Sequence, residues 1–142
     1  MYKLAISTSG EYVSAAIFEE KLLASFVSKT NKGSTGILLN QINELFDKTK
    51  ASRNDLNALY LDVGPGYYTG LRIGLSVSQG LGAVLGIPII PVNGLDALAF
   101  AAHTSHRKIC SLIDIKRNEF AYCEYMPAVS YTHLRAHETS PD

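Results

Sequence analysis

The residues best placed to do chemistry lie in one glycine-rich run, GPGYYTGLRIG, at residues 64–74. Glycine adopts backbone angles that other residues avoid, so this run suits a tight turn that approaches a ligand or another segment closely. Thr69 is predicted to cap the helix that follows, and the free N–H groups at a helix start favour an anion. Arg72 would add a bidentate donor for phosphate or carboxylate. The candidate anion site therefore comprises Gly64, Gly66, Thr69, Gly70 and Arg72.

The spacing of this run does not match the common nucleotide-binding loops. It contains neither G-x-x-x-x-G-K-[ST] nor G-x-G-x-x-G, and the sequence has no lysine between Lys50 and Lys108. The alternative interpretation is a structural turn, in which Pro65 stiffens the loop and the glycines permit close packing. The sequence leaves both interpretations open.

Other side chains that could take part in catalysis or metal binding are few and scattered. Asp62 follows a predicted strand just before the glycine run, where it would either cap the turn or bind magnesium through water. His103 and His106 lie near a predicted helix end without an adjacent carboxylate or cysteine, and His133 and His137 have H-x-x-x-H spacing close to the C-terminus. No Ser-His-Asp or Cys-His set can be assembled, so we predict neither a catalytic residue nor a metal ligand.

The composition bounds the class of protein. With 142 residues, 46% of them hydrophobic, the chain is long enough for a domain with a substantial core. Its 13 basic and 13 acidic residues cancel, so any RNA contact would be local or made through a partner. The two cysteines, Cys110 and Cys123, favour a reducing cytoplasm over a disulfide scaffold. We find neither a signal-type N-terminus nor an apolar run of about 18 residues, and expect no membrane span.

The pattern of apolar residues predicts a layered α/β fold. Three short β-rich runs joined by tight turns indicate an antiparallel meander, and the helical crossovers after them require parallel pairing. A mixed sheet flanked by helices is expected, in the order β-β-β-α-β-α-β-α of a ribonuclease-H-like lobe. The predicted strands are residues 2–8, 13–18, 22–28, 56–63 and 87–92, and the predicted helices are residues 36–49, 70–85 and 94–102.

A second lobe is predicted to begin near Lys108. The run KICSLIDIKRNEFAYCEY gives strand, polar turn and strand, and it repeats the layout of the N-terminal run KLAISTSGEYVSAAIF. Asp114 falls near the place that Ser7 occupies in the first copy. We therefore divide the chain into a first lobe at residues 1–106 and the first hairpin of a truncated second lobe at residues 107–128.

The last residues, Val129–Asp142, break with this pattern. They show no apolar period, which is typical of a disordered tail. The run VSYTHLRAHET also resembles the translation of a transposase-type adapter used in sequencing libraries, and we prefer this interpretation. The tail is therefore excluded from the prediction of the fold.

The predicted helix at residues 70–85 is poor in charge. From residue 56 to residue 106 the charged side chains are those of Asp62, Arg72 and Asp96 alone. At 100° per residue, one side of the helix carries Leu71, Leu75, Ser78, Gly82 and Leu85, and the roughly opposite side carries Ile73, Val77, Gly80, Leu81 and Val84. Both sides are apolar or small, so the helix needs two burial partners. One is its own sheet; the other is either the rest of its domain or, as we prefer, another subunit.

The run from Asp62 to Ala99 resembles the signature of the bacterial TsaB family, also called YeaZ. The usual family form is close to G-P-G-S-F-T-G-L-R-I-G, followed by a small-residue helix and G-I-P. The pair Tyr67-Tyr68 stands where Ser-Phe is common, and Asn93-Gly94 where Ser-Ser is common. The run IDIKRNEFAY is similar to the D-A-R-x-x-E-V-Y hairpin of the family, and the resemblance extends from Tyr2 to about Tyr125.

This resemblance implies an actin-like/sugar-kinase (ASKHA) fold of two ribonuclease-H-like lobes. It implies a non-catalytic assembly subunit of the complex that attaches threonylcarbamoyl to the adenosine beside the anticodon of tRNAs reading ANN codons. The implied partners are a catalytic paralogue, TsaD, and the ATPase TsaE, with tRNA contacted indirectly and a homodimer formed when the paralogue is missing. ATP and magnesium would be used by the complex, with no cofactor assigned to this chain.

The resemblance also implies where the partner binds, on the helices at residues 36–49 and 70–85. The interface candidates are Leu38, Leu39, Ile42, Leu45, Leu71, Leu75, Ser78 and Gly82.

Two departures from the family pattern bear on the alternatives. The family often begins I-D-T-S, whereas this chain has Ser7, which cannot supply the anionic ligand that magnesium needs in active ATPases of the superfamily. The H-S-E that often starts the first helix is replaced by Ser34-Thr35-Gly36. The alternatives are a fragment of an ASKHA-type ATPase or small-molecule kinase, which the serine disfavours, and a metallopeptidase-like protein, for which no ligand set is found.

Overall fold

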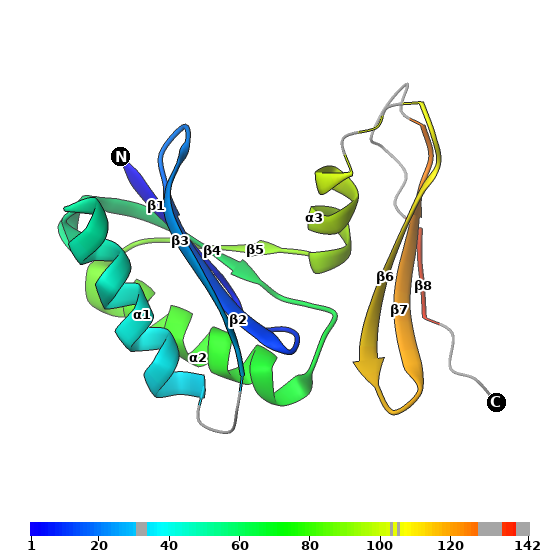
Figure 1. The fold of residues 1–142 in the computed structure, drawn as a ribbon, viewed down its shortest axis with the longest axis horizontal. Helices are drawn as coiled ribbons and strands as arrows, with labels where there is room; N and C mark the ends of the chain where they lie inside the picture. The colour runs from blue at the N-terminus through cyan, green and yellow to red at the C-terminus, as the bar shows by residue number, and fades with distance from the viewer. Residues whose placement is uncertain (31–33, 103, 105, 128–134, 139–142) are drawn as a thin grey trace.

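The computed structural model describes residues 1–30, 34–102, 104, 106–127 and 135–138. It contains a five-stranded sheet in the order β3-β2-β1-β4-β5 and a three-stranded sheet in the order β6-β7-β8 (Figure 1). The strands are β1 (Tyr2–Ser7), β2 (Tyr12–Phe18), β3 (Leu22–Lys29), β4 (Leu56–Asp62), β5 (Ile89–Val92), β6 (Ile109–Lys116), β7 (Glu119–Tyr125) and β8 (Arg135–Glu138). The α-helices are α1 (Ser34–Thr49), α2 (Tyr68–Leu85) and α3 (Gly94–Ala101).

The five-stranded sheet is mixed, as predicted. Strands β1, β2 and β3 form an antiparallel meander, whereas β4 pairs in parallel with both β1 and β5. Each parallel connection passes through a helix, because a parallel pair cannot be joined by a tight turn. The predicted order of elements is therefore confirmed for the first lobe.

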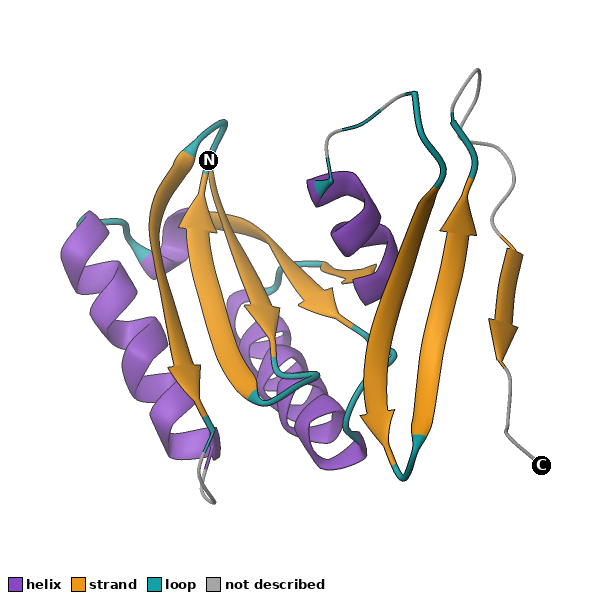
Figure 2. Ribbon diagram, turned by 45° about the vertical axis from the view of Figure 1, so that its right-hand side comes forward, coloured by secondary structure: helices purple, strands orange, loops and turns teal. Residues whose placement is uncertain are grey.

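One face of this sheet forms the main core. Alternate residues of the central strands, including Leu4, Ile6, Ile17 and Leu59, are at most 2% exposed and point toward α1 and α2. Figure 2 shows both helices running beside the sheet, and both contact its strands. The layered arrangement follows from the period-2 pattern of these strands and the 3.6-residue period of the helices.

Helix α3 packs on the second sheet, although it directly follows β5 in the chain. Its buried side chains Leu95 and Ala99 face the hairpin of β6 and β7, and Leu95 shares a small core with Ala121 and Cys123. The hydroxyl of Tyr125 donates to Asp96 Oδ1 at 2.5 Å. The predicted division after residue 106 assigns α3 to the first lobe. In the structure, however, α3 packs against the second sheet.

The predicted hairpin of the second lobe is present as β6 and β7, paired antiparallel from Ile109 to Tyr125. Strand β8 lies within the tail that resembles an adapter and pairs antiparallel with β7. The remainder of that tail, with His133, and also His103, lies outside the described residues. The origin of the tail stays a prediction.

The N-cap of α2 lies two residues before its predicted position. The N-cap is Tyr67, in an extended conformation and without a side-chain capping bond, so the prediction that Thr69 caps this helix is wrong. The cause is a backbone bond: the Tyr67 N–H donates to the carbonyl oxygen of Ser9 at 2.7 Å. That bond fixes the loop before Thr69 is reached. The predicted stop is confirmed, since Gly86 closes the helix in the left-handed conformation.

Two glycines let the start of α2 lie directly against the end of β1. A Cβ at Gly70 would overlap the carbonyl oxygen of Thr8, and one at Gly74 would overlap the Thr8 hydroxyl. That hydroxyl donates to the Gly70 carbonyl oxygen at 2.6 Å, and Thr8 is 2% exposed. The glycines thus serve close backbone packing, the structural interpretation of the run.

The carboxylate of Asp62 joins the ends of β1 and β4 to the glycine loop. Its Oδ2 accepts from the hydroxyls of Ser7 at 2.7 Å and Ser9 at 2.6 Å, and its Oδ1 accepts from the Gly64 N–H at 2.8 Å. The predicted turn-capping role of Asp62 is therefore confirmed. We call this arrangement of Ser7, Ser9, Asp62 and Gly64 the Asp62 junction.

The packing of α2 predicts opposite effects for two alanine substitutions in the same helix. Gly70→Ala should lower the free energy of unfolding by about 1–3 kcal/mol, because the rigid backbone of Thr8 cannot make room for a methyl group. Gly80→Ala should raise it by up to about 1 kcal/mol, because nothing lies within 4 Å of a Cβ there and alanine favours the helix. Chemical denaturation of both variants measures the difference, and equal effects would contradict this account.

From the geometry of the Asp62 junction we expect that the stability of the fold depends on the acceptor atoms of residue 62 more than on its charge. Asp62→Ala should lower the free energy of unfolding by about 1–3 kcal/mol, because it leaves two hydroxyls and one N–H without their acceptor. Asp62→Asn should cost less, since the amide oxygen still accepts from Gly64 and serine hydroxyls can also accept. Asp47→Ala, at an exposed position on α1, is the control and should have little effect. A loss no larger in Asp62→Ala than in the control would refute the prediction.

Candidate functional site

The side of α2 that faces away from the sheet is an exposed helix surface with little charge. We define the outer α2 surface by the exposed residues of this helix: Tyr68, Thr69, Arg72, Leu75, Ser76, Gln79, Gly80, Ala83 and Val84. Arg72 carries its only charge. Leu75 is 45% exposed and Val84 is 84% exposed, so apolar side chains flank a line of small and polar ones. A partner could approach the backbone of this helix closely, because few long side chains stand in the way.

The two apolar sides predicted for α2 are both turned largely toward the chain itself. One side meets the core through Ile73, Val77 and Leu81. On the other side Gly82 touches Ile89 of β5 and Ser78 is fully buried. The sheet and α1 together form a buried arc wide enough for both sides. The side left exposed carries small and polar residues with one charge and is flanked by Leu75 and Val84, which agrees with the small residues expected there but shows fewer apolar ones.

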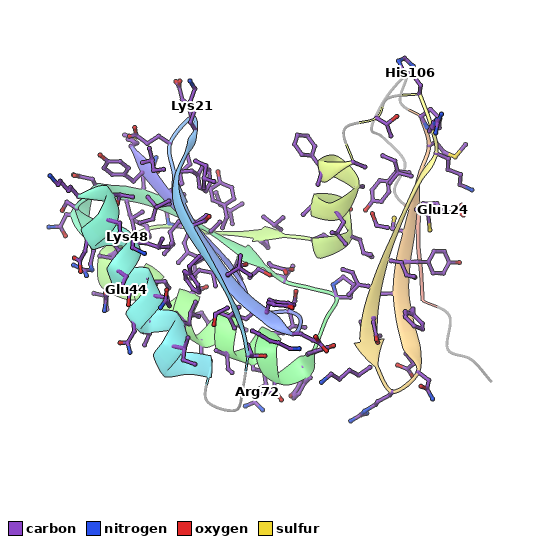
Figure 3. The ribbon with its side chains drawn as sticks, in the orientation of Figure 1. Lys21, Glu44, Lys48, Arg72, His106 and Glu124 are labelled. Atoms are coloured by element: carbon purple, nitrogen blue, oxygen red, sulfur yellow. The ribbon has the colours of Figure 1, made fainter. Side chains whose placement is uncertain are left out.

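Helix α1 exposes fewer of its predicted interface residues than expected. Its stripe of Leu38, Ile42 and Leu45 is at most 2% exposed and packs on β2 and β3. Leu39 is 40% exposed at the flank of the helix. Its solvent-facing side is polar, and Figure 3 shows Glu44 and Lys48 pointing away from the sheet.

The eight predicted interface residues thus fall into two groups. Leu39, Leu71 and Leu75 are exposed or half-buried and reach the surface. The other five, Leu38, Ile42, Leu45, Ser78 and Gly82, lie in the chain's own core, so they cannot contact a partner while the lobe is folded. The apolar residues that repeat with the helical period are those that the helix buries in its own domain. A choice of interface residues from this repeat on α1 therefore gives core residues.

The turn after β1 places carbonyl oxygens against the glycine loop, where an anion would need donors. The Ser9 carbonyl lies against Gly66 and accepts from Tyr67, and the Thr8 carbonyl lies against Gly70. Carbonyl oxygens repel an anion. Arg72 points away from the second sheet at the edge of α2 (Figure 3), over the ring of Tyr68 at 5.5 Å. The five residues of the predicted anion site are therefore divided between the packed loop and the outer α2 surface.

The same geometry does not fit a magnesium–phosphate group. Magnesium needs free anionic oxygens in an octahedral arrangement, but both oxygens of Asp62 already accept hydrogen bonds. Ser7 is a donor to that carboxylate and supplies no charge. Within the described residues no group of three or more His, Cys, Asp or Glu side chains could hold a metal ion.

A cleft of about 720 Å³ separates the glycine loop from the second sheet. It is lined by the β1–β2 turn, the start of α2 and the β6–β7 turn, which contributes Lys116 and Arg117. The sequence predicts a charged, solvated hairpin turn with Asp114, Arg117 and Glu119, but it did not single out Lys116, the residue before that turn. No described helix is long and apolar enough to cross a membrane.

Comparison with known proteins gives a consistent family. Residues 24–134 match the family model described as TsaD: tRNA N6-adenosine threonylcarbamoyltransferase. The chain is 31% identical over 125 residues to the tRNA threonylcarbamoyladenosine biosynthesis protein TsaB of Buchnera aphidicola subsp. Schizaphis graminum, covering 87% of this chain and 60% of that protein. It therefore spans less than two thirds of that relative's length.

Solved structures agree with the sequence match. YeaZ from Pseudomonas aeruginosa superposes with a TM-score of 0.80 at 26% identity, covering 97% of this chain and 65% of that one. A ROK family glucokinase from Streptomyces griseus has a TM-score of 0.53 at 13% identity, covering 95% of this chain and 46% of that one, a likeness of fold alone. The predicted ribonuclease-H-like fold of the ASKHA superfamily is confirmed. The chain belongs to the family that the tRNA N6-adenosine threonylcarbamoyltransferase model describes and, within it, to the TsaB or YeaZ proteins.

Proposed function

We propose that this chain acts in the synthesis of threonylcarbamoyladenosine on tRNA, as a non-catalytic assembly subunit that docks a catalytic paralogue. The observation that carries the proposal is the family match over residues 24–134, joined to an outer α2 surface with a single charge. The partner class is a TsaD-like protein, with a TsaE-like ATPase recruited to the pair and tRNA reached through them.

The outer α2 surface has the chemistry of a helix-packing site. The small side chains of Ser76, Gly80 and Ala83 let another helix come close with little loss of hydration. The flanking Leu75 and Val84 add apolar area that such a contact would bury. A self-complementary use of the same surface would give a homodimer when the paralogue is missing.

A non-catalytic role accords with the chemistry of the glycine loop. Ser7 donates a hydrogen bond to Asp62, and the carbonyl oxygens of Ser9 and Thr8 lie against Gly66 and Gly70 of the loop. We assign no cofactor to this chain and leave ATP and magnesium to its partners.

A matched pair of arginine substitutions tests the docking surface. Ala83→Arg, on the outer α2 surface, should reduce recovery of a co-expressed TsaD-like paralogue at least tenfold, which corresponds to about 1.4 kcal/mol of binding free energy. The long charged side chain would hold the two helices apart. Ala97→Arg makes the same change at an exposed position on α3 and should leave recovery unchanged.

Thermal unfolding of both variants ensures that the comparison is made between folded proteins. Full recovery with Ala83→Arg would remove the outer α2 surface from the interface. Equal losses in the two variants would show that charge alone, and not position, weakens the pair.

Nucleotide titration separates the assembly subunit from a kinase or ATPase. Isothermal titration of the chain with magnesium-ATP should give no saturable heat, because Asp62 is engaged by Ser7, Ser9 and Gly64 and position 7 supplies no carboxylate for the metal. The titration of a known ASKHA kinase under the same conditions is the positive control. Saturable binding in the micromolar range, lost in Asp62→Ala, would favour the kinase alternative.

A further inference from the structure

A side-chain contact crosses the cleft between the glycine loop and the second sheet. The Nζ of Lys116, at the β6–β7 turn, lies 4.1 Å from the centroid of the Tyr67 ring, which belongs to the loop before α2. Figures 1 and 2 both place the β6–β7 turn near the start of α2. An ammonium group over an aromatic face is attracted by the ring's quadrupole.

The charges around Tyr67 strengthen this attraction. Partial burial raises the pKa of the Tyr67 hydroxyl above its ordinary value, and the negative charges of Glu11 and Asp114 raise it further. Lys116 is the cation that faces this ring. The ring therefore stays neutral at physiological pH and remains a suitable face for the ammonium group.

The backbone of the β6–β7 turn holds Lys116 in place at an energetic cost. Lys116, Arg117 and Asn118 have φ angles of 68°, 59° and 61°, which are left-handed values that Asn adopts readily and that are unfavourable for Lys and Arg. The Lys116 N–H donates to Asp114 Oδ1 at 2.8 Å, and the strand register shifts between these two residues. The turn is thus fixed in a conformation that directs Lys116 across the cleft.

The other end of the cleft is joined at Gly94. This residue begins α3, which packs on the second sheet, and its N–H donates to the Gly64 carbonyl oxygen at 2.9 Å. A Cβ on Gly94 would lie 3.2 Å from Asp62 Oδ1 and 3.4 Å from Ile113 Cδ1. The chain therefore passes between the two sheets at a point of close backbone contact beside the Asp62 junction.

We propose that Lys116 and Tyr67 form a clasp that closes the cleft between two units that articulate at Gly94. One unit is the five-stranded sheet with α1 and α2; the other is α3 with β6 and β7. Loss of the clasp lets the units separate at the mouth of the cleft while they stay joined at Gly94. The clasp does not depend on the proposed function, since it concerns contacts within this chain.

Distance measurements between two spin labels test the clasp in the 142-residue chain. We choose the exposed positions Arg72 on α2 and Phe120 on β7, each changed to cysteine, with the exposed Cys110 changed to serine. The buried Cys123 stays. The parent should give one narrow distance distribution. Lys116→Met and Tyr67→Ala should each shift it to longer distances and broaden it.

Conservative and matched variants identify the cause of any change. Lys116→Arg and Tyr67→Phe keep a cation and a ring, and should give the parent distribution. Lys108→Met removes a lysine of the same sheet, one that pairs with Glu124 within the second unit at 2.7 Å, and should also leave it unchanged.

The clasp is overturned if Lys116→Met leaves the distribution as in the parent, or if Lys108→Met shifts it equally. Circular dichroism establishes that each labelled variant is folded. If Tyr67→Ala fails to fold, Lys116→Met decides the question, because Lys116 lies on an exposed turn.

Discussion

The carboxylate of Asp62 is the contact on which the arrangement of the molecule depends. It holds the hydroxyls of Ser7 and Ser9 and the N–H of Gly64, so it ties the ends of two parallel strands to the loop that leads into α2. A hydrogen bond from the Gly94 N–H to the Gly64 carbonyl oxygen connects the glycine loop to the start of α3. Because α3 packs on the second sheet, the direction of α2 and the point where that sheet is attached are set from one place.

Ser7 gives this junction a different chemistry from that of a metal-dependent kinase. A carboxylate at position 7 would stand beside Asp62, and two such groups at hydrogen-bond distance repel each other unless a cation or a proton lies between them. A hydroxyl needs neither, because it donates to the carboxylate directly. The junction is therefore complete with protein groups alone, and the glycines beside it serve packing.

Several predictions from the sequence were confirmed and others were wrong for identifiable reasons. The order of strands and helices, the mixed sheet and the helix stop at Gly86 followed from local patterns. Thr69 was taken as the helix cap because its side chain suits that role, but a long-range bond between Tyr67 and Ser9 starts the helix earlier. The interface residues on α1 were chosen from an apolar stripe, and an apolar stripe is what a helix buries first. The proposed function was inferred from the family resemblance, and the comparisons with known proteins support that resemblance.

The sequence by itself determined the elements, their order and the family, because periodicity, turn residues and the run from Asp62 to Ala99 are local properties of the chain. Only the tertiary structure decided which side of α2 faces water, since a helix with two apolar sides fits equally well in one wide groove or between two partners. It also decided that Arg72 leaves the glycine loop and that Lys116 reaches Tyr67. These relations join residues far apart in the chain, and their energies depend on distances that no local pattern records.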